Sequence, residues 1–174
     1  MDGLRAFNKN TQAVSAIEFA LIAPVMMVIM LGSISTYHLV RASMKLWDIT
    51  QSVSDLVSQQ QTLTAAEMTD ICTSTSLSKY PFTGTLKVAV ASVTHPSTGA
   101  TAIDWQDTTC GSGTAISNAL ALGAAYTPDP KDSVIIAKST YVYTFPPSYV
   151  LPSSITLTRT TYSKPRDGTQ VSRG

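Results

Sequence analysis

The strongest constraint on this sequence is a run of 22 residues, Phe19 to Val40, without Asp, Glu, Lys or Arg. As a helix rising about 1.5 Å per residue, the run reaches ~33 Å, enough to cross the hydrocarbon core of a bilayer. The alternative is a buried core helix, but a chain of 174 residues offers little protein to cover such a helix on every side. The run therefore predicts a single membrane-spanning helix.

A secretory signal peptide is a second alternative for the same run. Its apolar region spans only about 7–15 residues and ends at a small-x-small cleavage site. Here the run continues past Gly32 to Tyr37 and Leu39, so we favour the membrane anchor. In the alternative, the cut falls near Ser33 or Ser35.

The two cysteines bear on orientation, because basic residues flank the run on both sides and charge does not orient it. Cys72 and Cys110 both follow the apolar run. A disulfide between them is expected if that side faces an oxidising compartment, and two buried free thiols are the alternative. Their spacing matches no zinc motif.

Apolar residues continue at helical spacing beyond the run and predict that the helix extends until the polar stretch Ser58-Gln59-Gln60-Gln61 ends the pattern. This stripe is either a coiled-coil seam or a face covered by the chain's own globular part. It consists of Leu39, Ala42, Leu46, Ile49, Val53 and Leu56. Thr64 and Glu67 then form a capping box for a short helix through about Cys72.

The last hundred residues are rich in Thr, Ser, Val, Ile and Tyr between prolines and glycines, which is typical of a small sheet. Ile135, Ala137, Ser139, Tyr141, Tyr143 and Phe145 alternate, and we expect this face to pack on the long helix. The expected strands are 85–94, 102–106, 133–145 and 154–163, with a short helix at 114–122. The predicted fold class is α+β: a long N-terminal transmembrane helix followed by a small antiparallel β-sheet head.

Composition and motifs argue against an enzyme and against nucleic acid. Twelve basic and eleven acidic residues leave a net charge of +1, without the basic footprint that phosphate binding needs. Neither His38 nor His95 belongs to a ligand cluster, and no phosphate loop or nucleophile elbow is present. Asp104 and Asp107 are best explained as surface carboxylates beside a packed Trp105. We therefore expect no catalytic residues, no metal and no cofactor.

Glu18 lies at the leading edge of the apolar run, where a carboxylate near the bilayer centre would cost on the order of 2.5–3.5 kcal/mol. One interpretation is that Glu18 marks the water boundary and favours the positive end of the helix dipole. The other is that it pairs with a cation inside the membrane. Six residues later, Pro24 removes a backbone hydrogen bond and should loosen or kink the helix, although proline is also tolerated in membrane helices.

The segment from Ala13 to Val25, AVSAIEFALIAPV, resembles the N-terminal region of TadE/TadG-like proteins of tight-adherence (Flp-type) pilus systems. More broadly, it is similar to type IV prepilins. The resemblance is specific over residues 13–31, where Glu18-Phe19 is followed by Pro24 at a fixed spacing. It implies that a prepilin peptidase removes a hydrophilic leader and leaves a glutamate as the fifth residue of the mature chain. Counting back from Glu18 places that cut between Ala13 and Val14, and Ala13 stands where the family usually has Gly.

The resemblance implies three parts: a leader at 1–13, a transmembrane and amphipathic helix at 14–60, and an extracytoplasmic head at 61–174. Cleavage would expose a positively charged α-amine at Val14. In the low dielectric of the membrane, this amine can form an ion pair with the Glu18 carboxylate of an adjacent subunit. The implied function is that of a minor pilin or assembly factor of a tight-adherence (type IVc) pilus, acting in adhesion and biofilm formation. Its implied partners are the membrane, other pilins, pilus-assembly proteins and prepilin peptidase, and its implied place is the bacterial inner membrane with the head in the periplasm. The alternative is a single-pass periplasmic binding or adhesion module.

Overall fold

The structure, a computed structural model, describes residues 11–127, 129–145, 154–166 and 170–174. Side chains are described from Val14 onward, so most of the expected leader lies outside the described residues. The chain divides into two compact units, Met1–Val40 and Arg41–Gly174. Helix α2, Thr11–Ser58, contributes its first part to one unit and its second part to the other.

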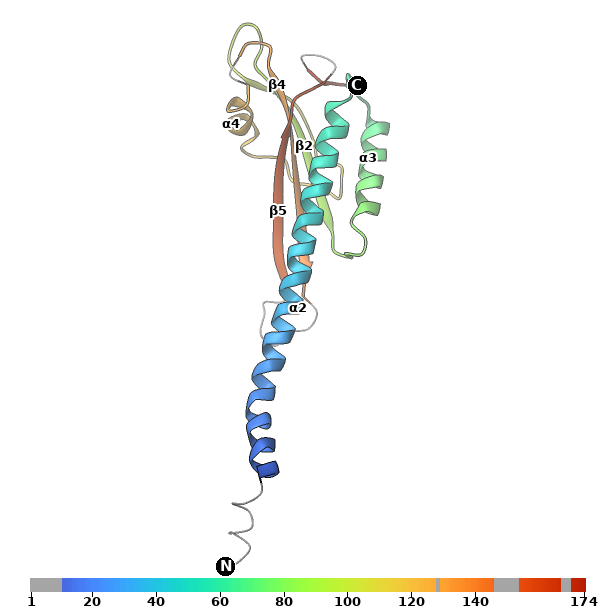
Figure 1. Cartoon of the computed structure of the whole chain (residues 1–174). Coiled ribbons are helices and arrows are strands. Elements are labelled where there is room, and N and C mark those ends of the chain that lie inside the picture. Colours follow the sequence, from blue (N-terminus) through green and yellow to red (C-terminus); the bar gives the residue numbers. More distant parts are fainter. Residues whose placement is uncertain (1–10, 128, 146–153, 167–169) are drawn as a thin grey trace, which may run out of the picture. The chain divides into compact units, whose positions relative to one another are not determined.

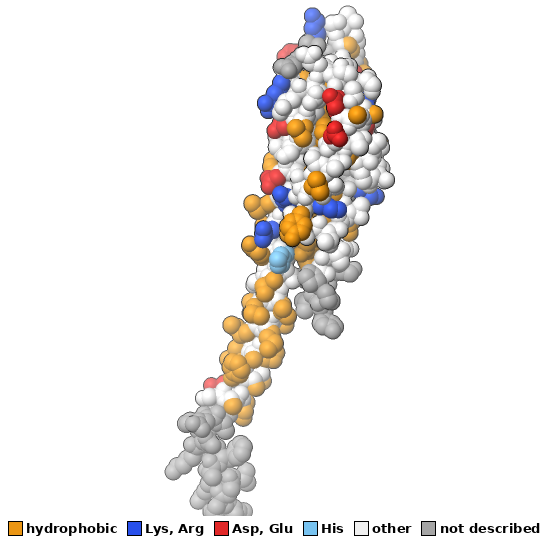
Figure 2. Space-filling view, turned by 90° about the vertical axis from the view of Figure 1, so that its right-hand side faces the viewer, with side chains coloured by type: hydrophobic (Ala, Val, Ile, Leu, Met, Phe, Trp, Pro, Cys, Tyr) orange, Lys and Arg blue, Asp and Glu red, His pale blue; other side chains and the backbone are white. Residues whose placement is uncertain are grey.

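The described part of the first unit is helical and apolar. Its side chains are largely exposed, and Figure 2 shows them as an almost continuous hydrophobic surface. Pro24 lies inside the helix. Among the described residues, one helix is long and apolar enough to span a membrane, and its most apolar window has a mean hydropathy of 2.3. This helix fits a single-pass membrane protein, as the apolar run predicts.

The second unit, here called the head, is a four-stranded sheet with helices on both faces (Figure 1). The strand order is β3-β2-β4-β5, and every neighbouring pair is antiparallel. A separate parallel pair joins β1 to β6, close to the C-terminus. The fold is therefore the expected α+β class. The remaining elements are β1 Thr62–Leu63, α3 Ala65–Ser78, β2 Leu86–Thr94, β3 Ala102–Asp107, α4 Ala119–Ala124, β4 Ser133–Thr144, β5 Ser154–Ser163 and β6 Ser172–Arg173.

One face of the sheet carries the second part of α2 together with α3 (Figure 1). Val53 and Val57 of α2 pack with Ile135 and Ala137 of β4, as the alternation along that strand predicts. In the head, the α2 stripe is thus covered by the chain's own sheet rather than left as a free seam. The last residue of the expected stripe, Leu56, is 41% exposed, and the neighbouring Val57 is buried in its place.

The opposite face is covered in part by α4, whose Ala119 packs against Val93 and Ile136. The helix expected at 114–122 begins only at Ala119. The reason is a tether that the sequence does not reveal: the backbone N–H of Ile116 donates to Oε1 of Gln106, at 2.9 Å, and holds this stretch against β3.

Helix α3 continues six residues beyond the expected end at Cys72. Its second half is almost entirely Ser and Thr, which favour turns because their hydroxyls compete for backbone groups. Here those hydroxyls bond within the helix instead. Thr73 donates to the Thr69 carbonyl at 3.0 Å, and Thr75 donates to the Ile71 carbonyl at 2.6 Å.

Candidate functional site

The residues singled out in the N-terminal segment all lie on helix α2. Val14, Glu18 and Pro24 are exposed, and Phe19 is 73% exposed. Ala13 is in the helix, but its side chain lies outside the described residues. Val14 and Glu18 are four residues apart and so share one helix face. This arrangement leaves both side chains accessible to a neighbouring molecule.

Three hydroxyl side chains in the apolar segment satisfy themselves within the helix. Ser33, Ser35 and Thr36 each donate to the carbonyl oxygen four residues earlier, at 2.8, 2.9 and 2.9 Å. A hydroxyl without a partner would be costly in hydrocarbon. These local hydrogen bonds therefore lower the cost of placing the three hydroxyls in the membrane. They could have been predicted from the sequence, because Ser and Thr in an apolar helix commonly donate to the carbonyl oxygen four residues earlier.

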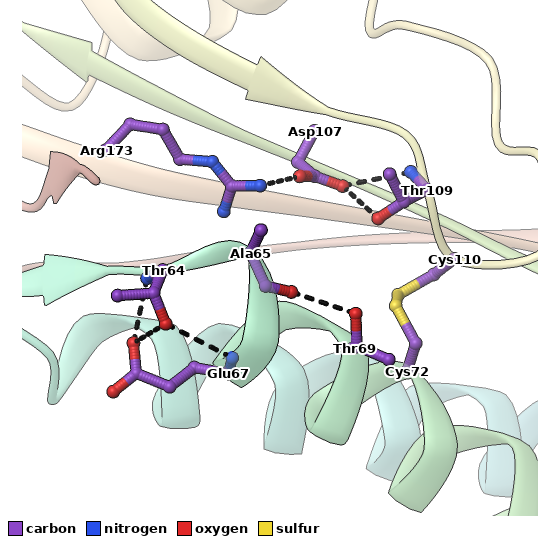
Figure 3. A network of polar contacts seen from close by, with 9 residues as sticks. All are labelled: Thr64, Ala65, Glu67, Thr69, Cys72, Asp107, Thr109, Cys110 and Arg173. Carbon is purple, nitrogen blue, oxygen red and sulfur yellow. Dashed lines mark hydrogen bonds and ion pairs between the residues drawn. A yellow bond between two sulfur atoms is a disulfide. The ribbon is translucent and has the colours of Figure 1, made fainter.

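The structure contains the Cys72–Cys110 disulfide (Figure 3). It links α3 to the turn after β3, with the two Cα atoms 5.1 Å apart. Cys110 belongs to the core between the helices and the sheet, and Cys72 packs at its edge. The bond thus fastens one helix to the sheet on the face that the helices cover.

The capping box at the start of α3 is present as the sequence predicts (Figure 3). The Glu67 N–H donates to Oγ1 of Thr64 at 3.3 Å, while the Thr64 N–H and hydroxyl both donate to Oε2 of Glu67 at 2.8 Å. These hydrogen bonds to Thr64 lower the pKa of Glu67 below its ordinary value. The group caps a helix and offers no base to a substrate.

The acidic residue Asp107 has a partner that the sequence did not suggest. Its carboxylate is 4% exposed and forms an ion pair with Arg173 of β6, while Thr109 donates to Oδ1 through its N–H at 2.9 Å and its hydroxyl at 2.6 Å (Figure 3). The Arg173 guanidinium also lies 5.8 Å from the ring centroid of Trp105. The expectation of a surface carboxylate is therefore wrong for Asp107, because the C-terminal segment folds back and covers it.

The other polar candidates also serve the fold. Asp104 accepts from the hydroxyls of Ser92 at 3.0 Å and Thr94 at 2.5 Å. Nδ1 of His95 lies 3.0 Å from the Thr127 carbonyl oxygen. Within the described ranges, no three His, Cys, Asp or Glu side chains gather closely enough to hold a metal ion. The largest exposed apolar surface of the described residues lies on the first part of α2.

A family model described as TadE-like protein matches residues 13–46. The match begins at Ala13 and ends within the stretch of α2 that enters the head core. No curated protein and no solved structure matches the chain significantly. Over this segment the chain is thus similar to TadE-like proteins, as its sequence motif indicates.

Proposed function

We propose that this protein is a pilin-like minor subunit or assembly factor of a tight-adherence pilus. The observation that carries the proposal is the TadE-like match over residues 13–46, which covers the exposed apolar part of α2 and includes Glu18 and Pro24. The proposed mechanism is structural: the apolar segment anchors the chain and packs with pilin helices, while the head presents a contact surface. Surface adhesion and biofilm formation would follow from the pilus.

The proposed processing step is cleavage between Ala13 and Val14 by a prepilin peptidase. It would remove the leader 1–13 and leave the helix 14–60 and the extracytoplasmic part 61–174, which is the head without its α2 residues. Intact-mass analysis of protein from the native host tests this step, with Val14 expected as the mature N-terminus. Ala13→Gly should leave that terminus unchanged, and Ala13→Leu should retain the leader. A terminus near Ser33 or Ser35 would contradict prepilin processing.

The proposed role of Glu18 is to receive the Val14 amine of an adjacent subunit inside the membrane. An uncompensated carboxylate costs free energy there, so replacing it should leave insertion intact while removing the partner of the amine. Glu18→Ala is expected to keep a normal membrane level but to lower pilus production and recovery with pilins. Glu18→Gln keeps the size and hydrogen bonding and isolates the charge. Normal piliation in both variants would discard this role.

The proposed orientation places the head in the periplasm of a bacterial inner-membrane protein. The disulfide supports this choice, because such bonds persist in oxidising compartments. Sheared filaments provide the test of the whole proposal: recovery of the protein with the major pilin supports a filament or assembly role. An envelope-retained monomer that binds a specific ligand would instead support a membrane-anchored binding or adhesion module.

A further inference from the structure

A hollow of about 240 Å³ on the head brings together two elements that are distant in the sequence. The second part of α2 contributes Arg41, Met44 and Lys45, and the turn after α3 contributes Tyr80. Met44 is 64% exposed and Tyr80 is 83% exposed, the highest value among the large hydrophobic side chains that the structure describes. We call these four residues the aromatic-basic patch. Figure 2 shows hydrophobic and basic side chains lying next to one another on the head.

Tyr80 is exposed on a turn that is firmly held. The Tyr80 N–H donates to the Leu77 carbonyl at 3.3 Å, and the Phe82 N–H donates to the Lys79 carbonyl at 2.9 Å. The Phe82 ring packs edge-on against Tyr141, at 6.5 Å between centroids. The fold therefore presents this aromatic ring to its surroundings, although burying it would remove apolar surface from water.

The charges of the patch favour an anionic surface. Arg41 and Lys45 line the hollow together with one carboxylate, that of Asp48. No ion pair joins Lys45 to a carboxylate among the residues that the structure describes. Long basic side chains can lay their methylene stems along apolar groups while the charge reaches a phosphate.

The position of the aromatic-basic patch along the chain favours the membrane surface as its partner. Arg41 directly follows Val40, the last residue of the apolar run, and Met44 comes one helical turn later. Tyr and Trp concentrate at membrane–water interfaces, and basic clusters beside a membrane span bind anionic lipid headgroups. We propose that the aromatic-basic patch docks the head on the bilayer surface, with Arg41 and Lys45 binding lipid phosphates and Met44 and Tyr80 entering the acyl boundary. This docking rests on the membrane anchoring in the proposed function and not on the pilus role.

Fluorescence quenching by brominated lipids tests the docking in the full-length chain. Trp47 and Trp105 are the two native tryptophans, so Trp47→Phe leaves a background of Trp105 alone. Adding Tyr80→Trp to that background places a reporter on the turn. In vesicles of phosphatidylglycerol and phosphatidylcholine brominated near the headgroup, we expect at least twofold more quenching than in the parent. Arg41→Gln with Lys45→Gln should reduce it to the level found with phosphatidylcholine alone.

Leu120→Trp in the same background is the matched control, because Leu120 is 46% exposed on α4, which packs on the other face of the sheet. No added quenching is expected there. Equal quenching at positions 80 and 120 would overturn the docking. The docking would also be overturned if the fluorescence of Trp at position 80 changed only when the protein-to-lipid ratio was increased. That result would indicate contact between copies of the protein rather than contact with lipid. The vesicles contain no other pilus protein, so these results stand apart from the Glu18 test of the proposed function.

Discussion

The indole Nε1 of Trp105 donates a hydrogen bond of 2.8 Å to the carbonyl oxygen of Val171. This bond ties the edge strand β3 to the C-terminal segment, and Val171 is itself fully buried in the core. Two residues later Arg173 pairs with Asp107, at the end of the same strand. The last few residues of the chain are therefore a structural part of the head, and this leads to the first of four predictions.

Arg173→Ala should destabilise the head by about 2 kcal/mol, because it leaves a buried carboxylate without its cationic partner. Chemical unfolding of the full-length chain in detergent, followed by tryptophan emission, measures the change. Arg166→Ala is the matched control, since its 3.8 Å pair with Asp55 is largely exposed and should contribute no more than about 0.5 kcal/mol. Equal effects of the two substitutions would contradict the role assigned to the buried pair.

Reduction of the Cys72–Cys110 disulfide should also destabilise the head. The bond closes a loop between residues 38 apart, for which the chain-entropy estimate is about 4 kcal/mol. The measurement compares unfolding with and without reductant, and Cys72→Ala/Cys110→Ala serves as the control that no longer responds to reductant. Differential alkylation of protein from the native envelope should label neither cysteine, and two labelled thiols would count against the periplasmic orientation.

Removal of the capping box should weaken α3. Thr64→Ala is expected to cost about 1 kcal/mol, because the Thr64 side chain accepts the Glu67 N–H at the helix start. The hydrogen bonds that lower the pKa of Glu67 also make part of this stability depend on pH. The contribution is present above the ordinary, unfolded pKa of the group and is lost as the pH falls through the lowered folded value.

Unfolding measured across that acidic range checks the linkage. Glu67→Gln retains a hydrogen-bonding side chain at the same position but does not titrate, so its pH dependence should be smaller than that of the parent. An unchanged pH profile would show that the carboxylate of Glu67 contributes no pH-dependent stability.

Gly111 follows Cys110 with a φ of +68°, and a Cβ at this position would lie 2.1 Å from the carbonyl oxygen of Leu86. Gly111→Ala should therefore destabilise the head by more than the roughly 1 kcal/mol of an ordinary left-handed glycine. Gly99 also has a positive φ, of 113°, but its Cβ would meet nothing closer than 4.0 Å. A similar loss of stability in Gly99→Ala, measured by thermal unfolding, would show that the close approach to Leu86 has no effect of its own.

The regular elements of the head were predictable where side-chain alternation and helical spacing are strong. The expected strand at 154–163 has the same bounds as β5, and the other three differ from the observed strands by one residue at one end. The helix expected from the apolar run and its stripe agrees with α2. These signals are local, because the burial of one face imposes a period on the sequence itself.

The pairing of β1 with β6 was not predictable in the same way. Each strand has two residues, and Thr62 pairs with Ser172 across nearly the whole head sequence. A strand of two residues is too short to show an alternation of buried and exposed side chains. The burial of Asp107 by Arg173 depends on this long-range pairing. Local sequence patterns do not predict contacts that form only after the chain has folded back on itself.

By itself, the sequence determined the apolar anchor, the carboxylate at its leading edge, the α+β class and the two cysteines that form the disulfide. All of these depend on residue types and on their spacing along the chain. Only the tertiary structure decided that Asp107 is buried beneath the C-terminal segment, and that Tyr80 lines one hollow with Met44 and Lys45. Those residues are distant in the sequence, and their proximity arises because the core between α2, α3 and the sheet positions the turns around it.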